Sequence, residues 1–291
     1  MHVPVHSVSV YVKDQGKGTP TLFLHGNPDS ADLWDELIEL LSPKLRCIAP
    51  DLPGFGRSSA PADFDCSLEN MARFVDGLVE ALGITERMNL VVHDFGGPFG
   101  LAWAIRHHWK VRRIVAINTV FFSDYRWHPW ARVWRTPLLG EFSMALMNRR
   151  LFARALRRAS PMLPADKIRQ AYAWVKSPMK RMILRLYRAT DPGNFAWWED
   201  HLRALTVRIP ALVLWGDQDP YIQKRYADRF GARKVVHFPA YGHWLPAEAP
   251  AKVAGHLLDF FETSPQEAPG TLKTDLTASA DRPRSAAEVR P

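Results

Sequence analysis

The sequence has little that would mark a disulfide-rich, metal-binding or membrane-spanning protein. It contains only two cysteines, Cys47 and Cys66, which argues against a disulfide framework or a thiolate metal site and is typical of a reducing cytosol. No apolar run reaches the roughly 18 residues of a membrane-spanning helix. The first residues also lack the basic and apolar regions of a signal peptide. We therefore expect a cytoplasmic protein with no membrane span and no metal.

Recognisable nucleic-acid-binding motifs are absent as well. The formal net charge is +8, and residues 120–209 contain 17 Lys/Arg against 6 Asp/Glu. A basic surface of this kind can attract nucleic acid, anionic lipid or an acidic substrate, or it can simply be a solvated helical face. Because no zinc-finger or RNP pattern accompanies the charge, we expect no nucleic-acid partner.

What the sequence does contain is a globular composition, 47% hydrophobic with 11 Trp and 15 Phe. Short apolar runs alternate with segments of helical periodicity. Strands are expected at residues 8–12, 21–24, 47–49, 89–92, 113–117, 210–215 and 234–238, and helices at about 33–41, 68–82, 97–107 and 250–261. Strands with few polar positions, separated by helices, predict an α/β fold with a mostly parallel sheet covered on both faces.

The strand pattern stops in the middle of the chain. Residues 120–209 are predicted to be helical and are rich in Arg and Trp, so we interpret them as a helical cap inserted into a core of residues 1–119 and 210–262. From residue 264 onward Pro, Ala, Ser, Thr and charged residues dominate, which predicts a disordered tail over 263–291.

Asp94 occupies a position that usually carries chemistry. It follows a buried strand and precedes a glycine-rich helix start, in Val-His-Asp-Phe-Gly-Gly (92–97). A side chain on such a sharp strand-to-helix turn projects above the carboxyl edge of the sheet, where many hydrolases place a nucleophilic serine. A plain helix N-cap is the alternative interpretation. The chain has no Gly-x-Ser-x-Gly elsewhere, so Asp94 is the candidate nucleophile.

Two further candidates follow later strands. His243 lies in a loop after the last expected strand, and Asp219 follows the strand before it, with Asp217 as a nearby competitor. Taken singly, each is more often an ordinary loop residue. Taken together, nucleophile, acid and histidine stand in the chain order of a hydrolase triad, each at the carboxyl end of a strand.

These residues belong to a wider resemblance that extends over about 20–260. The chain resembles the α/β-hydrolase superfamily, and within it the aspartate-nucleophile branch of haloalkane dehalogenases and epoxide hydrolases. The resemblance rests on His-Gly-Asn-Pro at 25–28, Asp-Leu-Pro-Gly-Phe-Gly-Arg-Ser at 51–58, the Asp94 turn, residues 215–220 and Gly-His-Trp at 242–244.

The resemblance implies a mechanism. Asp94 would attack an sp³ carbon and form an alkyl-enzyme ester. His243 would activate the water that cleaves the ester, and Asp219 would orient the imidazole. The backbone N–H groups of Phe95 and Asn27 would form the oxyanion hole. Such an enzyme needs no cofactor.

The branch is harder to choose. The residues at positions 27 and 92, Asn and Val, are those typical of dehalogenases. In those enzymes the side-chain amide at the position of Asn27 helps to hold the halide. Dehalogenases carry Trp after the nucleophile, whereas this chain has Phe95, which has no donor. Haloalkane dehalogenase-like cleavage is favoured, with an epoxide hydrolase as the alternative. A non-catalytic binder or a cofactor-free oxygenase on the same fold also stays open.

The cap should form the substrate pocket. Its tryptophans predict a small apolar or aromatic substrate. Residues expected to line the pocket are Trp127, Trp130, Tyr187 and Trp244. Tyr187 resembles one of the two proton-donating tyrosines of epoxide hydrolases, with Tyr125 or Tyr172 as the other, although it can equally be an ordinary helical tyrosine. The sequence leaves the oligomeric state open.

Overall fold

The centre of the molecule is an eight-stranded sheet with the order β1-β2-β4-β3-β5-β6-β7-β8. The protein is seen in a computed structural model that describes residues 1–262, so the tail expected over 263–291 lies outside the described residues. The pairs β1–β2 and β2–β4 are antiparallel, and every other neighbouring pair is parallel. The predicted α/β-hydrolase architecture is therefore confirmed. The strands are β1 (His2–Val5), β2 (Val8–Gln15), β3 (Pro20–Leu24), β4 (Arg46–Pro50), β5 (Met88–His93), β6 (Val111–Ile117), β7 (Ala211–Gly216) and β8 (Lys234–Phe238).

The central strands are buried along their whole length. Every residue of β3, β5 and β7 is buried, because helices cover both faces of a parallel sheet and leave no face for water. The sequence patterns located all the strands except β1, a short edge strand in which only Val3 and Val5 are buried.

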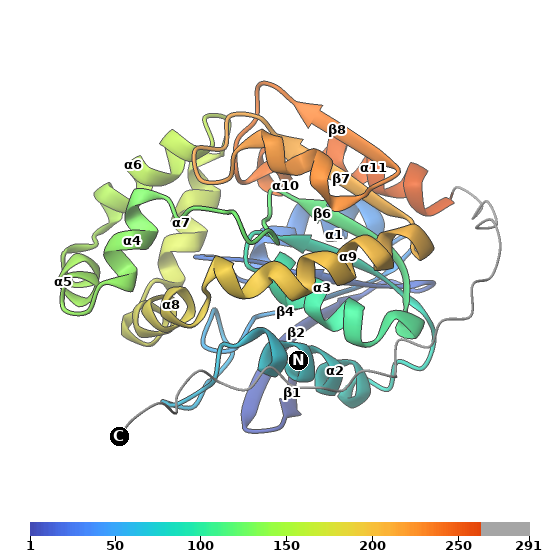
Figure 1. The fold of residues 1–291 in the computed structure, drawn as a ribbon, viewed down its shortest axis with the longest axis horizontal. Coiled ribbons are helices and arrows are strands. Elements are labelled where there is room, and N and C mark those ends of the chain that lie inside the picture. Colours follow the sequence, from blue (N-terminus) through green and yellow to red (C-terminus); the bar gives the residue numbers. More distant parts are fainter. Residues whose placement is uncertain (263–291) are drawn as a thin grey trace, which may run out of the picture.

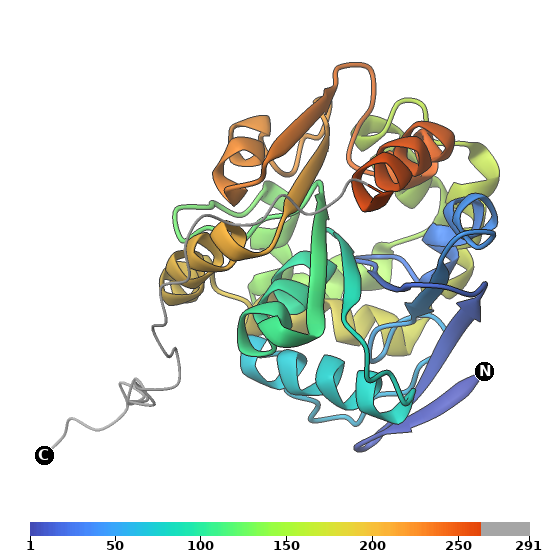
Figure 2. The ribbon, with the colours of Figure 1, turned by 90° about the vertical axis from the view of Figure 1, so that its right-hand side faces the viewer.

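Helices lie on both faces of this sheet (Figure 2). On one face α3 (Gly96–Arg106) packs against α2 (Leu68–Ala81) and α9 (Ala196–Arg208), and on the other α1 (Asp35–Leu41) packs against α11 (Pro250–Glu262). Ser67 caps α2, as its position predicts, by accepting the Asn70 N–H. The remaining short elements around the sheet are α10 (Leu245–Glu248) and the 3₁₀ helices η1 (Ala31–Trp34), η2 (His108–Lys110), η3 (Pro192–Phe195) and η4 (Lys224–Phe230).

The helical insertion lies to one side of the sheet, at the left of Figure 1. It consists of α4 (Pro129–Arg135), α5 (Leu139–Leu146), α6 (Arg149–Ala159), α7 (Ala165–Trp174) and α8 (Ser177–Ala189). The next helix, α9, packs along α3 and so covers the sheet. The boundaries 120–209 for the cap remain a prediction, and the packing of α9 favours a cap that ends before this helix.

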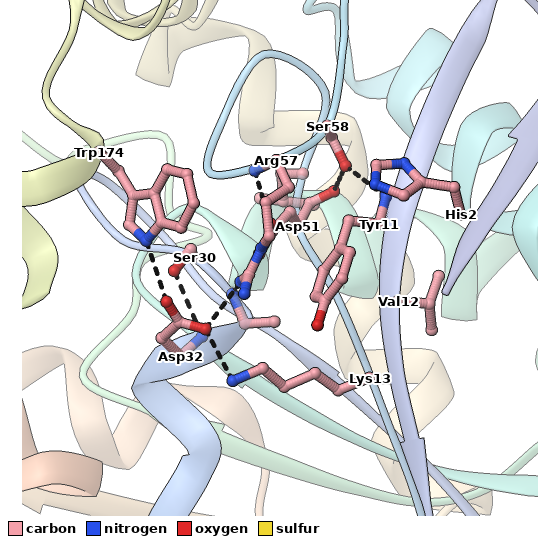
Figure 3. A network of polar contacts seen from close by, with 12 residues as sticks. His2, Tyr11, Val12, Lys13, Ser30, Asp32, Asp51, Arg57, Ser58 and Trp174 are labelled. Atoms are coloured by element: carbon pink, nitrogen blue, oxygen red, sulfur yellow. Dashed lines mark hydrogen bonds and ion pairs between the residues drawn. The ribbon is translucent and has the colours of Figure 1, made fainter.

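A polar network joins the insertion to the sheet (Figure 3). The Trp174 indole of α7 donates to Asp32 Oδ2 over 2.9 Å. The other oxygen of Asp32 pairs with Lys13 and Arg57 at 2.7 Å each, and Arg57 also pairs with Asp51 at 2.7 Å. Burial disfavours the charge of Asp32, but Lys13, Trp174 and Arg57 outweigh it and hold its pKa at about 2. This network therefore fixes α7 against the core.

Candidate active site

Asp94 lies on a sharp turn between β5 and α3. Its φ of +49° is in the left-handed region that non-glycine residues rarely adopt. The surrounding backbone has no room for side chains. A Cβ on Gly26 would lie 2.2 Å from Asp94 Oδ1, and one on Gly96 would lie 2.1 Å from the Leu24 carbonyl oxygen. These glycines let the turn sit close to β3, so that the Asp94 carboxylate faces the cavity described below.

The two oxygens of the Asp94 carboxylate have different partners. The Asn27 N–H donates to Oδ1 over 2.7 Å, and Oδ2 lies 3.4 Å from His243 Nε2. The Thr119 hydroxyl holds the Asp94 carbonyl oxygen at 2.6 Å. Burial opposes ionisation, but His243 and the Asn27 N–H outweigh it and lower the pKa of Asp94. The carboxylate is therefore ionised and oriented.

His243 is buried between two carboxylates. Its Nδ1 lies 2.7 Å from Asp219 Oδ2, on the opposite side of the ring from Asp94. Burial alone would lower its pKa, but Asp219 and Asp94 outweigh burial and raise it to about 10. The competing carboxylate, Asp217, instead contacts His237 at 2.6 Å. The structure thus brings together Asp94, His243 and Asp219, as their chain order predicts.

Asn118 supports Asp219 and was missed by the sequence analysis. Its amide donates to Asp219 Oδ2 over 3.0 Å and to the Gly216 carbonyl oxygen over 3.1 Å, and it accepts the Gly216 N–H at 2.8 Å. The N–H groups of Tyr221 and Ile222 hold the other Asp219 oxygen. Asn118 directly follows β6, so the rule that located Asp94 and Asp219 at strand ends could also have found it.

An apolar cavity of about 590 Å³ opens above Asp94. The predicted residues that line it are Asn27, Asp94, Phe95, Trp127, Trp130, Tyr187, His243 and Trp244. Asp219 lies behind His243, outside the lining. Of the two possible partner tyrosines, Tyr125 lines the cavity, whereas Tyr172 packs against Phe152.

The side chain that directly follows Asp94 offers no hydrogen-bond donor to the cavity. The ring of Phe95 stacks on Trp127, with 5.9 Å between the ring centroids, and meets the ring of Tyr187 edge-on, with 4.9 Å between the centroids. The Asn27 amide nitrogen lies 3.4 Å from the Tyr187 hydroxyl. Burial raises the pKa of Tyr187 well above its ordinary value, so this hydroxyl keeps its proton. The buried Trp127 Nε1 has no hydrogen-bond partner within residues 1–262.

Two more titratable groups lie near the site without a sequence signal that singled them out: His128 lines the cavity, and Asp29 lies behind the lining residue Trp244. Asp29 accepts the Trp244 indole N–H at 2.6 Å, and burial raises the pKa of this carboxyl to about 7. His128 caps α4 by accepting the Ala131 N–H at 3.2 Å, and burial lowers its pKa to about 4. His128 is therefore neutral at physiological pH.

No group of three or more His, Cys, Asp or Glu side chains in residues 1–262 is arranged to hold a metal ion. Within the same residues, no helix combines the length and apolarity needed to cross a bilayer.

Comparisons with known proteins show the family and the fold. The family model of the alpha/beta hydrolase fold matches residues 19–250. A cis-3-alkyl-4-alkyloxetan-2-one decarboxylase of Xanthomonas campestris is 30% identical over 273 residues, which cover 85% of this chain and 90% of the relative. Haloalkane dehalogenase 2 of Mycobacterium bovis is 27% identical over 267 residues, covering 87% and 91%. The crystal structure of an ancestral haloalkane dehalogenase superposes with a TM-score of 0.74 at 27% identity, covering 90% and 100%.

Proposed function

Because the chain belongs to the α/β-hydrolase fold family and is related to haloalkane dehalogenases and an oxetanone decarboxylase, we propose that it is a hydrolase with Asp94 as nucleophile. The observation that carries the proposal is the Asp94 carboxylate at the base of an apolar cavity. Asn27 N–H holds one of its oxygens and His243 faces the other. The substrate that we favour is a haloalkane.

The reaction has two covalent steps. An Asp94 oxygen attacks the carbon that bears the halogen, a carbon–oxygen bond forms, and the halide leaves with the bonding electron pair. Water then adds to the carbonyl carbon of the Asp94 ester while His243 accepts its proton. The Asn27 N–H already contacts a carboxylate oxygen and would stabilise the negative charge that develops there. Collapse releases the alcohol and restores Asp94.

The charges around His243 control its protonation state in each step. In the free enzyme two carboxylates keep the imidazole protonated, since they raise its pKa to about 10. Ester formation removes the charge of Asp94 and leaves only Asp219, so the pKa of His243 falls and the ring releases its proton to solvent. The neutral imidazole can then accept the proton of the attacking water. His243 thus becomes a base only after the ester has formed.

Opening of a strained oxygen-containing ring is the second candidate, and Phe95 favours it. An indole donor for a leaving halide is missing at this position, so halide binding would depend on the Asn27 amide and Trp127 Nε1. A leaving oxygen could instead take a proton from the Tyr187 hydroxyl, which lies 3.4 Å from Asn27. An epoxide or an oxetanone ring, the substrate named for the Xanthomonas relative, has such an oxygen.

The experiment is to trap the ester. His243→Ala is incubated with a bromoalkane, an epoxide and a 3,4-dialkyl-oxetan-2-one, and the intact protein mass is measured. The reactive substrate should leave an adduct on Asp94, which peptide mapping locates: the alkyl group of the bromoalkane with loss of bromide, or the whole ring-opened molecule of the epoxide or oxetanone. Asp94→Asn should acquire no adduct. His237→Ala is the matched control, because His237 contacts Asp217 away from the cavity, and it should turn over without accumulating an adduct.

Wild-type assays of halide, diol and alkene formation then separate the candidates. Halide release would support the favoured substrate, whereas diol or alkene alone would replace it with an epoxide or an oxetanone. In oxygen-18 water, a single turnover should place the label in the Asp94 carboxylate and not in the alcohol. Label in the alcohol would show that water attacks the substrate directly and would overturn the role of Asp94 as nucleophile.

A further inference from the structure

The mouth of the cavity is surrounded by exposed apolar side chains. Five residues line the cavity and are still 48% to 62% exposed to solvent: Trp130, Leu139, Phe142, Leu146 and Leu151. Together with Leu138, which is 83% exposed, they make up what we call the docking face. Soluble proteins rarely expose a contiguous apolar patch, so such a patch usually indicates an interaction surface.

Helix α5 exposes this face to solvent at the cavity mouth. Leu139, Phe142 and Leu146 follow a spacing of three and four residues, so they lie on one side of the helix. That side is exposed, whereas Gly140 and Met144 are buried. The apolar stripe of α5 is therefore open to solvent at the cavity mouth, whereas a helix of a packed core buries its apolar side.

Leu138 stands at the start of α5 in an unusual backbone conformation. Its φ is +65° and its ψ is −44°, and the N–H of Leu139 donates to the carbonyl oxygen of Pro137 over 2.8 Å. A tight turn of this kind is strained for a residue with a branched side chain. Strain of this type is kept where a side chain has a use, and here it holds an exposed leucine at the tip of the docking face.

Helix α6, which contributes Leu151 to the docking face, is rich in arginine. Helix α6 carries Arg149, Arg150, Arg154, Arg157 and Arg158, and all five are exposed. None of them forms an ion pair with another residue of 1–262, and the helix contains no acidic residue. Arg154 and Arg158 also reach the cavity lining. The apolar face thus has an uncompensated positive border.

We propose that the docking face sits on a lipid surface with anionic headgroups and that apolar substrate enters the cavity directly from the lipid. Leucine, phenylalanine and tryptophan flanked by arginine form the side-chain set that binds the interface of an anionic bilayer. A second copy of the chain is a poorer occupant, because a face-to-face dimer would bring two sets of these five arginines together.

The test is binding of the full chain to vesicles. Wild-type protein should co-sediment with vesicles of phosphatidylcholine that contain phosphatidylglycerol and bind pure phosphatidylcholine much less, and salt should weaken binding. Arg150→Glu/Arg157→Glu should reduce the affinity by at least tenfold, since each basic residue near an anionic surface contributes roughly a fivefold factor. Leu138→Ser/Phe142→Ser should also lose binding.

Matched controls change similar residues elsewhere. Arg112→Glu/Arg233→Glu alters exposed arginines outside the cap, and Leu40→Ser/Val207→Ser alters apolar residues that are 46% and 75% exposed. Both should bind like wild type, with circular dichroism confirming that every variant is folded. Asp94→Asn should bind as well, so a failure of the proposed chemistry would leave this result unchanged.

Two results would overturn the proposal. One is equal binding of both vesicle types by wild type and variants, or no binding at all. The other is a wild-type dimer in sedimentation velocity that Leu138→Ser/Phe142→Ser dissociates while neither protein binds vesicles, which would assign the face to a second copy.

Discussion

Phe95 is the residue that most restricts the chemistry open to Asp94. It follows the candidate nucleophile directly, and its ring packs between Trp127 and Tyr187. A phenyl ring fills this space without offering a hydrogen bond to a leaving group. A leaving halide would therefore have to be held by other donors at the cavity, such as the Asn27 amide and Trp127 Nε1.

Replacing Phe95 with Trp should supply the missing donor. If a halide leaves from the cavity, Phe95→Trp should increase the rate of halide release by roughly tenfold, because a placed donor stabilises the charge that develops on the leaving group. Phe95→Leu is the control, since it alters the ring but adds no donor. An equal response of both variants in a halide assay would mean that the donor has no part in the reaction.

Asp29 should make the stability of the protein depend on pH. Its pKa is about 7 in the folded protein, against an ordinary value of 3.8, because burial disfavours the carboxylate and Trp244 only partly compensates. Between these two pKa values the folded protein keeps a proton that the unfolded chain releases. The free energy of unfolding therefore decreases as the pH rises through this range. Asp29→Asn avoids this loss and should be more stable than wild type by on the order of 2 kcal/mol at about pH 8.

Urea denaturation at several pH values measures this difference. The advantage of Asp29→Asn should shrink as the pH falls towards about 4, because the carboxyl is then protonated in the folded state and about half protonated in the unfolded state. Asp63→Asn, at an exposed position, is the control and should show no such trend. A pH-independent difference for Asp29→Asn would contradict the raised pKa.

At the scale of elements, the helical insertion α4–α8 has one fixed side and one lightly attached side. Helix α7 is tied to the core by Trp174 with Asp32, by Gln170 with Asp35 at 3.2 Å, and by Lys167 with Glu36 at 2.8 Å. Helix α5 packs against α4 and α8, which are themselves parts of the insertion. Rearrangement that widens the cavity mouth should therefore involve α5 more readily than α7.

The Trp174–Asp32 hydrogen bond should account for much of this anchoring. Trp174→Phe keeps an aromatic ring near Arg57 but removes the N–H, which should cost about 1–2 kcal/mol because the acceptor is charged. Amide hydrogen exchange of α7 should become faster, while that of α2 should not change. Tyr172→Phe, on the same helix, is the control. Unchanged exchange in α7 would show that packing alone holds the helix.

At the scale of the whole molecule, a buried charged network joins segments that are distant in sequence. Asp51 is fully buried after β4. It accepts the Ala31 N–H at 2.6 Å from η1 and pairs with Arg57, which also reaches Asp32 (Figure 3). The network therefore depends on strands β2 and β4, the η1 turn and helix α7 being assembled together.

Removing the central cation should destabilise the entire fold. Arg57→Met leaves Asp51 buried without its countercharge, and breaking a buried pair on one side costs about 3–5 kcal/mol. Arg46→Met, which breaks the more exposed pair with Asp14, should cost about 1 kcal/mol or less. Thermal unfolding by calorimetry compares the two. Equal losses would mean that the Asp51 network is no stronger than a surface ion pair.

Site residues could be predicted from the sequence when the signal lay within a few neighbouring residues, and not when it depended on residues far apart along the chain. Asp94, His243 and Asp219 were found because each stands at the end of a strand, and strand ends can be located from apolar runs. Asn118 stands at such an end too, but an asparagine alone does not indicate that it binds a carboxylate. Asp29 was missed because its environment depends on Trp244, which is 215 residues away along the chain.

The sequence by itself determined the alternation of strands and helices and the placement of Asp94 on a sharp turn, because apolar periodicity and glycine positions act within a few residues. Only the tertiary structure decided that Asp219 and not Asp217 contacts His243, and that two carboxylates keep this imidazole charged. It also decided that the apolar side of α5 is open to solvent at the cavity mouth. These features depend on burial and on contacts between distant segments, which arise only when the sheet and the cap are packed together.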